Sequence, residues 1–246
     1  MDRMLYVAMN GASETLVAQA ANTNNLANSS TTGFRADLAA FRSMPVFGYG
    51  YPTRVYSMAE HPGVDFSAGT ISATGRELDV AVNGQGWIAV QTRDGSEAYT
   101  RAGDLRLNTV GQLVTGAGLP VMGNDGPIAI PPSSKIEIAA DGTISTLPIG
   151  QPLNALAVVN RIKLVNPPLD QLQKGSDGLF RTKTGTAAEA DANVQLVSGS
   201  LESSNVNPVE SMVNMITLAR QYEMQVKAMR SVEENDQAAV KLLTMS

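Results

Sequence analysis

The sequence predicts an α+β protein with long N- and C-terminal helices packed as a coiled-coil-like pair and a central all-β domain of short antiparallel strands. Two observations support this fold class. Apolar residues recur at helical spacing in residues 1–28 and 209–243. Between about residues 69 and 199, short runs that alternate apolar and polar side chains are separated by Gly-containing turns. The two ends of the chain therefore differ in character from its middle.

This pattern also predicts the domain organisation. We expect residues 1–40 and 201–246 to form the two halves of a helical assembly domain. Residues 41–75 hold several Pro and Gly residues among aromatic side chains, which predicts an extended connector. Residues 76–200 should form the central all-β domain.

Composition excludes several classes of function. The chain of 246 residues carries 18 basic and 23 acidic side chains, a net charge of −5, and no basic run that could neutralise a phosphate backbone, so we expect no nucleic acid partner. No apolar run is long enough to span a bilayer, so we expect no membrane insertion. The absence of cysteine excludes disulfides and thiolate metal sites.

The start of the chain has some features of a secretory signal peptide but lacks others. Ala18-Gln19-Ala20 looks like a small-residue cleavage site. The charges of Asp2 and Arg3 cancel, however, and Asn10, Ser13 and Glu14 interrupt the apolar stretch. We therefore expect no cleaved signal peptide.

The N-terminal helix is predicted from a seam whose members follow alternating steps of four and three, the spacing of a coiled coil. Its members are Leu5, Met9, Ala12, Leu16, Gln19, Thr23 and Leu26. Around the end of this seam, Asn22, Asn25 and Asn28 stand three apart and would share one helical face. Each Asn costs a helix roughly 0.5 kcal/mol against Ala. The row could fix the register between packed helices, or it could be a fraying helix end before a polar loop.

The C-terminal segment gives the stronger helix signal, with Pro208 at a first-turn position behind Asn207. One seam comprises Met212, Met215, Ala219, Tyr222, Val226, Met229, Val240 and Leu243, and a second comprises Val209, Ile216, Ala219, Glu223 and Val226. At ~1.5 Å per residue this helix would be about 54 Å long, whereas the N-terminal helix would reach roughly 40 Å. Part of its surface should therefore contact other subunits, although a two-helix hairpin against its own core is the simpler alternative.

The middle of the chain predicts strands with short hairpins. Glu77 to Val82, Trp87 to Gln91, Tyr99 to Leu107 and Ile136 to Ile138 are the clearest strands. Gly84-Gln85-Gly86 begins a match to a dinucleotide-binding fingerprint, but that fingerprint requires a helix at its glycines. Because a strand is predicted there, we expect no nucleotide site.

Catalytic residues are not predicted. His61 is the one histidine, and no Gly-x-Ser-x-Gly elbow occurs. No ligand spacing indicates a metal, and we expect no cofactor. A β-rich enzyme acting on glycans would need two opposed carboxylates, for which Asp79 and Asp104 are the candidates. A secreted adhesion or tail-type module that trimerises through its ends is a further alternative.

Several motifs occur in a characteristic order. The Asn-rich stretch ends in Thr32-Gly33-Phe34-Arg35, and a second motif runs from Ser203 to Glu210. Between them lie Leu78 to Trp87, Tyr99 to Gly103 and Gly111 to Val114. In this order and spacing the chain resembles the flagellar rod and hook family of bacterial axial proteins over nearly its whole length. Arg35 stands where that family commonly has Lys, and Trp87 where Phe is usual, and neither departure threatens the fold.

The resemblance implies a structural protein without enzymatic activity or cofactors. In that family the terminal helices pack into the inner tube of the axial structure, and the β domain lies outside them. The resemblance further implies export through the flagellar type III apparatus without a cleaved signal, and a location in the basal-body rod in the periplasm. The implied function is that of a proximal-rod subunit that contributes to torque transmission and motility, with a distal-rod subunit as the alternative.

The implied partners are other proximal and distal rod subunits, basal-body ring components and export apparatus components, in a helical hetero-oligomer. From the helical seams and the motifs together we predict a subunit interface. Its residues are Leu5, Met9, Leu16, Asn22, Asn25, Leu26, Asn28, Gly33, Phe34, Asn205, Met212, Met215, Ile216, Tyr222, Val226, Met229 and Leu243.

Overall fold

The computed structural model describes residues 2–45, 55–148, 150 and 156–244. The chain divides into two compact units. Unit 1 comprises Met1–Ser29, Ala36–Asp65 and Val206–Ser246, and unit 2 comprises Ser30–Arg35 and Phe66–Asn205. Residues 1–40 were predicted as the N-terminal half of the helical assembly domain and residues 41–75 as a connector. Each of these two ranges contributes residues to both units.

Unit 1 contains the two predicted helices, α1 (Asp2–Ala27) and α2 (Pro208–Thr244). The Asn207 side chain caps α2, because its Oδ1 accepts hydrogen bonds from the backbone N–H groups of Val209 and Glu210 at 3.1 and 3.4 Å. Pro208 occupies the first helical position, where its missing N–H costs nothing. The helix predictions at both ends of the chain are confirmed.

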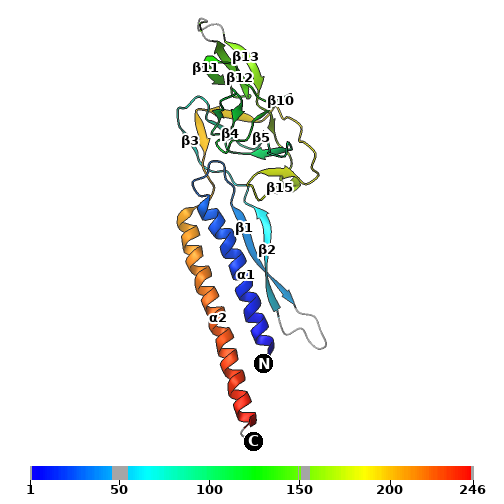
Figure 1. Cartoon of the computed structure of the whole chain (residues 1–246), viewed down its shortest axis with the longest axis vertical. Coiled ribbons are helices and arrows are strands. Elements are labelled where there is room, and N and C mark those ends of the chain that lie inside the picture. The colour runs from blue at the N-terminus through cyan, green and yellow to red at the C-terminus, as the bar shows by residue number, and fades with distance from the viewer. Residues whose placement is uncertain (1, 46–54, 149, 151–155, 245–246) are drawn as a thin grey trace. The chain divides into compact units, whose positions relative to one another are not determined.

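The two helices lie side by side and run in opposite directions (Figure 1). The face of α1 that is buried carries small side chains, namely Ala8, Ala12, Thr15 and Ala18. Gly11 lies on the same side, where an added Cβ would come within 2.9 Å of Gln225 Nε2. Small residues thus let the helix backbones approach closely, and the larger apolar side chains of the predicted seam are left for other contacts.

A β-hairpin completes unit 1. Strands β1 (Asp37–Pro45) and β2 (Val55–Val64) pair antiparallel, with a register shift between Leu38 and Ala40. The sequence predicted an extended connector over residues 41–75 but gave no pairing for it, and the described part of this segment supplies most of the hairpin. His61 lies in β2 and not in a loop. The apolar alternation of β1 is weak, which explains why sequence reasoning missed the pairing.

The described part of unit 2 is an all-β body of antiparallel strands (Figure 1). The largest sheet has the order β14 (Leu164–Val165), β5 (Trp87–Gln91), β6 (Glu97–Thr100), β16 (Phe180–Thr182) and β15 (Leu172–Lys174). A second sheet has the order β11 (Ser133–Ile138), β12 (Thr143–Pro148) and β13 (Ala157–Arg161). A short 3-10 helix, η1 (Leu169–Gln171), precedes β15.

Four two-stranded pairs complete the described strands of unit 2. They are β3 (Ile71–Ala73) with β18 (Ser200–Glu202), β4 (Val80–Asn83) with β17 (Gln195–Ser198), β7 (Arg106–Leu107) with β8 (Leu113–Val114), and β9 (Met122–Gly123) with β10 (Gly126–Pro127). The pairs that involve β17 and β18 bring the end of the β region back to its beginning. This return places Glu202 beside segments that precede it by more than 100 residues.

The core of unit 2 is aliphatic. Its fully buried members include Val80, Ile88, Val90, Leu105, Leu113, Val121, Ile128 and Ile144. Each such side chain contributes about 1.5–3 kcal/mol through burial. The predicted strands correspond to β4, β5, β6 and β11, although the segment from Tyr99 to Leu107 is divided between β6 and β7. Strand β5 begins at Trp87 directly after Gly86, which confirms that no helix follows these glycines.

Candidate functional site

The candidate site in unit 1 is the apolar surface of its helices. On α1, the predicted residues Leu5, Met9 and Leu16 are exposed, and Leu16 is 48% accessible. They were predicted to lie in a subunit interface, and within the single chain the buried positions of α1 are taken by small side chains instead. The predicted apolar side chains of α1 therefore remain accessible to a neighbour.

The start of α2 carries a second exposed apolar stripe. Val209, Met212, Val213 and Ile216 follow the spacing i, i+3, i+4, i+7 and are all exposed, with Val209 at 69%. Met212 and Ile216 belong to the predicted interface, whereas Val209 and Val213 were not included in it. The hydrophobic spacing at the helix start could have identified both.

The remaining predicted residues of α2 lie closer to the contact with α1. Met215, Tyr222, Val226 and Met229 are half-buried, as is Leu26 on α1. Leu243 lies on α2, but its side chain falls outside the described residues. This face of α2 is thus partly occupied within the chain, and the stripe at its start is not.

The asparagine row has three separate local roles. Asn22 Nδ2 donates to Ser211 O on α2 at 2.8 Å. Asn25 holds the start of β1, because its Nδ2 donates to Asp37 O and its Oδ1 accepts from Asp37 N, both at 2.8 Å. Asn28 Nδ2 donates to Asn24 O at the end of α1 at 3.0 Å. Asn22 links the two helices and Asn28 terminates one, so each alternative interpretation describes part of the row.

A groove of about 690 Å³ lies where α2 extends past the start of α1. Helix α2 has 37 residues and α1 has 26, which leaves the last turns of α2 without α1 beside them. The lining residues are Leu5, Val232, Glu233, Asp236, Gln237, Val240 and Lys241. The groove combines apolar side chains with acidic ones at one end of unit 1.

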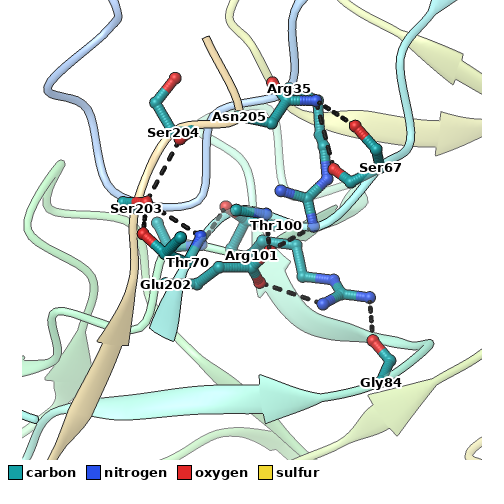
Figure 2. Close-up of polar contacts among 12 residues, drawn as sticks. Arg35, Ser67, Thr70, Gly84, Thr100, Arg101, Glu202, Ser203, Ser204 and Asn205 are labelled. Carbon is teal, nitrogen blue, oxygen red and sulfur yellow. Dashed lines mark hydrogen bonds and ion pairs between the residues drawn. The ribbon is translucent and has the colours of Figure 1, made fainter. Parts of the chain in front are cut away.

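Unit 2 contains a buried ionic cluster around Glu202, shown in Figure 2. Glu202 Oε1 accepts hydrogen bonds from Arg35 Nη2 at 2.6 Å and from the Gly69 backbone N–H at 2.9 Å. Glu202 Oε2 accepts one from Arg101 Nη1 at 3.0 Å. The side chains of Arg35 and Glu202 are each only 1% exposed. We call Arg35, Gly69, Arg101 and Glu202 the Glu202 cluster.

The Glu202 cluster holds two guanidinium groups on one carboxylate. Burial lowers the pKa of Arg101, an effect that the charge of Glu202 opposes. Arg101 also donates from Nη2 to Gly84 O at 2.7 Å, and its guanidinium lies 5.3 Å from the Trp87 ring centroid. Arg35 Nε, Arg35 Nη1 and Arg101 Nε are buried without a hydrogen-bond partner. The cluster thus contains more donors than its acceptors satisfy.

The predicted residues Gly33, Phe34 and Asn205 surround this cluster within unit 2. Gly33 N donates to Glu202 O at 2.9 Å, and Asn205 N donates to Phe34 O at 3.3 Å. Lys174 Nζ lies 4.0 Å from the Phe34 ring centroid and donates to Arg35 O at 2.7 Å. These contacts give all three residues roles inside the chain, and their predicted part in a subunit interface stays a prediction.

Sequence reasoning did not assign Glu202 or Arg101 to the site. Glu202 lies directly before the motif that begins at Ser203, and Arg101 lies inside the motif that begins at Tyr99. A charged residue inside or directly beside each of three motifs, with Arg35 as the third, was the available signal. Their separations of 101 and 167 residues gave no reason to pair them.

Among the described residues, no group of three or more His, Cys, Asp or Glu side chains could hold a metal ion. The helices of the described chain include none with the length and apolarity needed to cross a membrane.

Three family profiles match successive parts of the chain. The profile of the flagella basal body rod protein matches residues 5–35, and that of the flagellar hook protein FlgE/F/G D1 domain matches residues 81–146. The profile of the flagellar basal body rod FlgEFG protein C-terminal matches residues 197–242. The first and last of these cover most of α1 and α2.

Full-length relatives point to one member of this group. The chain is 49% identical to the flagellar basal-body rod protein FlgF of Escherichia coli (strain K12), over 100% of both chains. It is 33% identical to FlgF of Caulobacter vibrioides, over 99% of this chain and 98% of the relative. A FlgG from Buchnera aphidicola subsp. Acyrthosiphon pisum is 33% identical over 89% of this chain and 90% of the relative. The chain belongs to the FlgF family of flagellar basal-body rod proteins and is a structural subunit of the rod of the basal body.

Proposed function

We propose that this rod subunit acts in the proximal rod and joins its neighbours through the exposed apolar faces of α1 and α2. The two helices then pack as a coiled-coil-like pair within a tube of helices from several subunits. The specific partners are other proximal and distal rod subunits, basal-body ring components and export apparatus components. In this position the protein transmits torque and has no catalytic activity.

One observation carries the proposal: two apolar stripes of unit 1 lie at the surface of the single chain. The first includes Met9 and Leu16 on α1, and the second includes Val209, Met212 and Ile216 on α2. Contiguous exposed apolar surface on a folded chain marks an interaction site. Because the stripes lie on two different helices, a contact between unlike surfaces of neighbouring subunits would extend into an open helical array.

The carboxylates considered for an enzyme support the non-catalytic proposal. Asp79 is buried, forms an ion pair with Arg76 and accepts a hydrogen bond from Thr74 Oγ1 at 2.7 Å. Asp104 lies opposite Asp79 in an isolated β-bridge, and its Oδ2 is 3.8 Å from Arg106 Nη2. A glycan-acting pair needs two carboxyl groups that face a substrate between them. Asp79 instead stabilises its own turn.

The experiment compares two substitutions on neighbouring positions of α2. Met212→Asp places a charge in the exposed stripe, and Asn214→Asp places the same charge on an exposed polar position two residues away. We expect both purified variants to unfold at the same urea concentration as the parent. Only Met212→Asp should abolish rod assembly and swimming, because its carboxylate would be buried without a partner at the interface.

Electron microscopy of isolated rods measures assembly, and the spread of cells in soft agar measures swimming. Normal rods and normal swimming with Met212→Asp would contradict the proposed interface. Loss of assembly in both variants would show that added charge alone is harmful, and the proposal would lose its support.

A further inference from the structure

The chain passes between the two units at four points, and the neighbouring residues of unit 2 meet at one place. The passages follow residues 29, 35, 65 and 205. The segments of unit 2 beside them are residues 30–35, the stretch that begins at Phe66, and the stretch that ends at Asn205. Figure 2 shows residues from all three segments around the Glu202 carboxylate.

Side-chain bonds connect these segments directly. The Glu202 carboxylate binds Arg35 of the first segment and the Gly69 backbone N–H of the second. Its other oxygen accepts a hydrogen bond from Arg101, which directly follows strand β6. This bond attaches the cluster to the β strands of unit 2. One side chain therefore ties the three junction segments together and attaches them to the sheet.

Further hydrogen bonds join the stretch that begins at Phe66 to the stretch that ends at Asn205. Thr70 and Ser203 are joined by three of them: Ser203 N donates to Thr70 O at 2.9 Å, Thr70 N donates to Ser203 Oγ at 3.1 Å, and the two hydroxyls lie 2.8 Å apart. Asn205 Nδ2 donates to Ser67 O at 3.2 Å. A force that separates any two of these segments must break several bonds at once.

We infer that the Glu202 cluster is a force-transmitting clamp, which gathers the chain segments that leave unit 2 and distributes load among them. The inference rests on the proposed function, in which the subunit carries torque. Force that enters unit 2 along one segment passes to the others through the clamp and need not travel through the hydrophobic core. Burial strengthens these bonds, because water cannot compete for the charged groups.

The composition of the cluster favours this role over simple stabilisation. A buried ion pair is often no more stabilising than well-packed apolar residues, and unsatisfied buried donors carry a cost. The cluster keeps two Arg on one Glu and leaves three guanidinium nitrogens without partners. Apolar side chains at these positions would avoid that cost, but they would not bond three segments at fixed geometry.

The test pulls single full-length molecules along two directions. Because the chain has no cysteine, handles can be attached at introduced pairs. Handles on the pair Ser30→Cys and Val206→Cys apply force to the junction segments. Handles on the pair Asp125→Cys and Ala187→Cys apply force to the β strands of unit 2 away from the junction. Glu202→Gln breaks the clamp, and Glu97→Gln is the matched control, since Glu97 pairs with Lys163 at 2.9 Å at a largely buried site of the same unit.

With the junction handles, we expect Glu202→Gln to raise the unfolding rate under load by roughly a hundredfold, because removing one partner of a buried ion pair is strongly destabilising. With the β-body handles, the rise in unfolding rate caused by Glu202→Gln should be at least about tenfold smaller. This corresponds to a difference of about 1.4 kcal/mol in the height of the unfolding barrier. Glu97→Gln should act equally in both directions. An equal effect of Glu202→Gln in both directions would overturn the clamp, as would an equal effect of the two variants at the junction handles.

If Glu202→Gln does not fold, Arg35→Lys provides the second variant. It keeps the charge but loses the planar geometry that Arg offers a carboxylate, so it should show the same directional effect at smaller size. An Arg35→Lys variant without any directional difference would overturn the clamp. These measurements use isolated molecules and do not require rod assembly, so their failure is separate from failure of the Met212→Asp experiment.

Discussion

At the residue scale, Gly33 is a position where backbone conformation and space are both restrictive. Its φ of +67° lies in the left-handed region, and a Cβ there would come within 2.3 Å of the Arg101 carbonyl carbon. Gly75 has a similar φ of +74°, but a Cβ there would meet nothing within 4 Å. Comparing substitutions at Gly33 and Gly75 therefore separates the energetic cost of the left-handed backbone from the cost of the steric overlap with Arg101.

We expect Gly75→Ala to lower the free energy of unfolding of unit 2 by about 1 kcal/mol, the cost of a left-handed L-residue. Gly33→Ala should lower it by a further 1–3 kcal/mol or so, because the overlap must move main-chain atoms. Urea unfolding followed by the fluorescence of Trp87 measures both values. Equal losses for the two variants would mean that the close approach at Gly33 relaxes freely.

Tyr99 makes the stability of unit 2 sensitive to alkaline pH. Burial raises its pKa from 10.0 to about 12, and the Ala188 N–H that donates to its hydroxyl at 2.7 Å opposes this shift only in part. The neutral phenol is thus favoured in the folded state. Its contribution to stability is fully present below pH 10 and is lost as the pH rises through 12, since the unfolded chain ionises first.

We therefore expect the free energy of unfolding to fall by on the order of 2 kcal/mol between pH 10 and 12 in the parent chain. In Tyr99→Phe this decline should be smaller by the same amount, because the ionisable group is absent. Urea unfolding at a series of pH values gives the comparison. Parallel pH profiles for the two proteins would contradict a raised pKa at Tyr99.

At the element scale, the helices and the clearest strands could be predicted because their signals are local. Strand β5 is a short apolar run that directly follows a Gly-containing turn, and α2 has a Pro at its first position and a seam that continues for many turns. The hairpin β1–β2 could not be predicted in the same way. Its pairing is long-range and is supported by Asn25, which bonds the Asp37 backbone from another element.

The packing face of α1 illustrates a second limit. The spacing of apolar residues predicted a seam on this helix, and Leu5, Met9 and Leu16 of that seam were assigned to a subunit interface. In the single chain the buried positions of α1 are held by small side chains such as Ala8 and Ala12, and Gly11 lies next to Gln225 of α2. Periodicity identifies the faces of a helix, but it does not decide which face meets which neighbour.

At the scale of the whole molecule, the Glu202 cluster forms only because distant segments of the chain come together in the fold. Arg35, Arg101 and Glu202 are ordinary charged residues in the sequence, and only the return of β17 and β18 to β4 and β3 brings them together. The family resemblance supplied the motifs that contain or adjoin them. The buried pairing itself follows from topology, so it required the folded structure.

This topology leads to a prediction about domain boundaries. A chain of residues 30–206 keeps the whole Glu202 cluster, whereas a chain of residues 41–204 lacks Gly33, Arg35 and Asn205. Both retain the β strands of unit 2. We expect the longer chain to unfold cooperatively as a β-rich protein, and the shorter one to lose about 3–5 kcal/mol, because Glu202 keeps Arg101 but loses its other charged partner.

Circular dichroism during urea unfolding measures the two stabilities, and Glu202→Gln in each chain is the control. The substitution should weaken the longer chain strongly. In the shorter chain it should matter much less, since there the cluster is already incomplete. Equal midpoints for the two chains would show that residues 30–40 contribute nothing to unit 2, and the assignment of residues 30–35 to it would then fail.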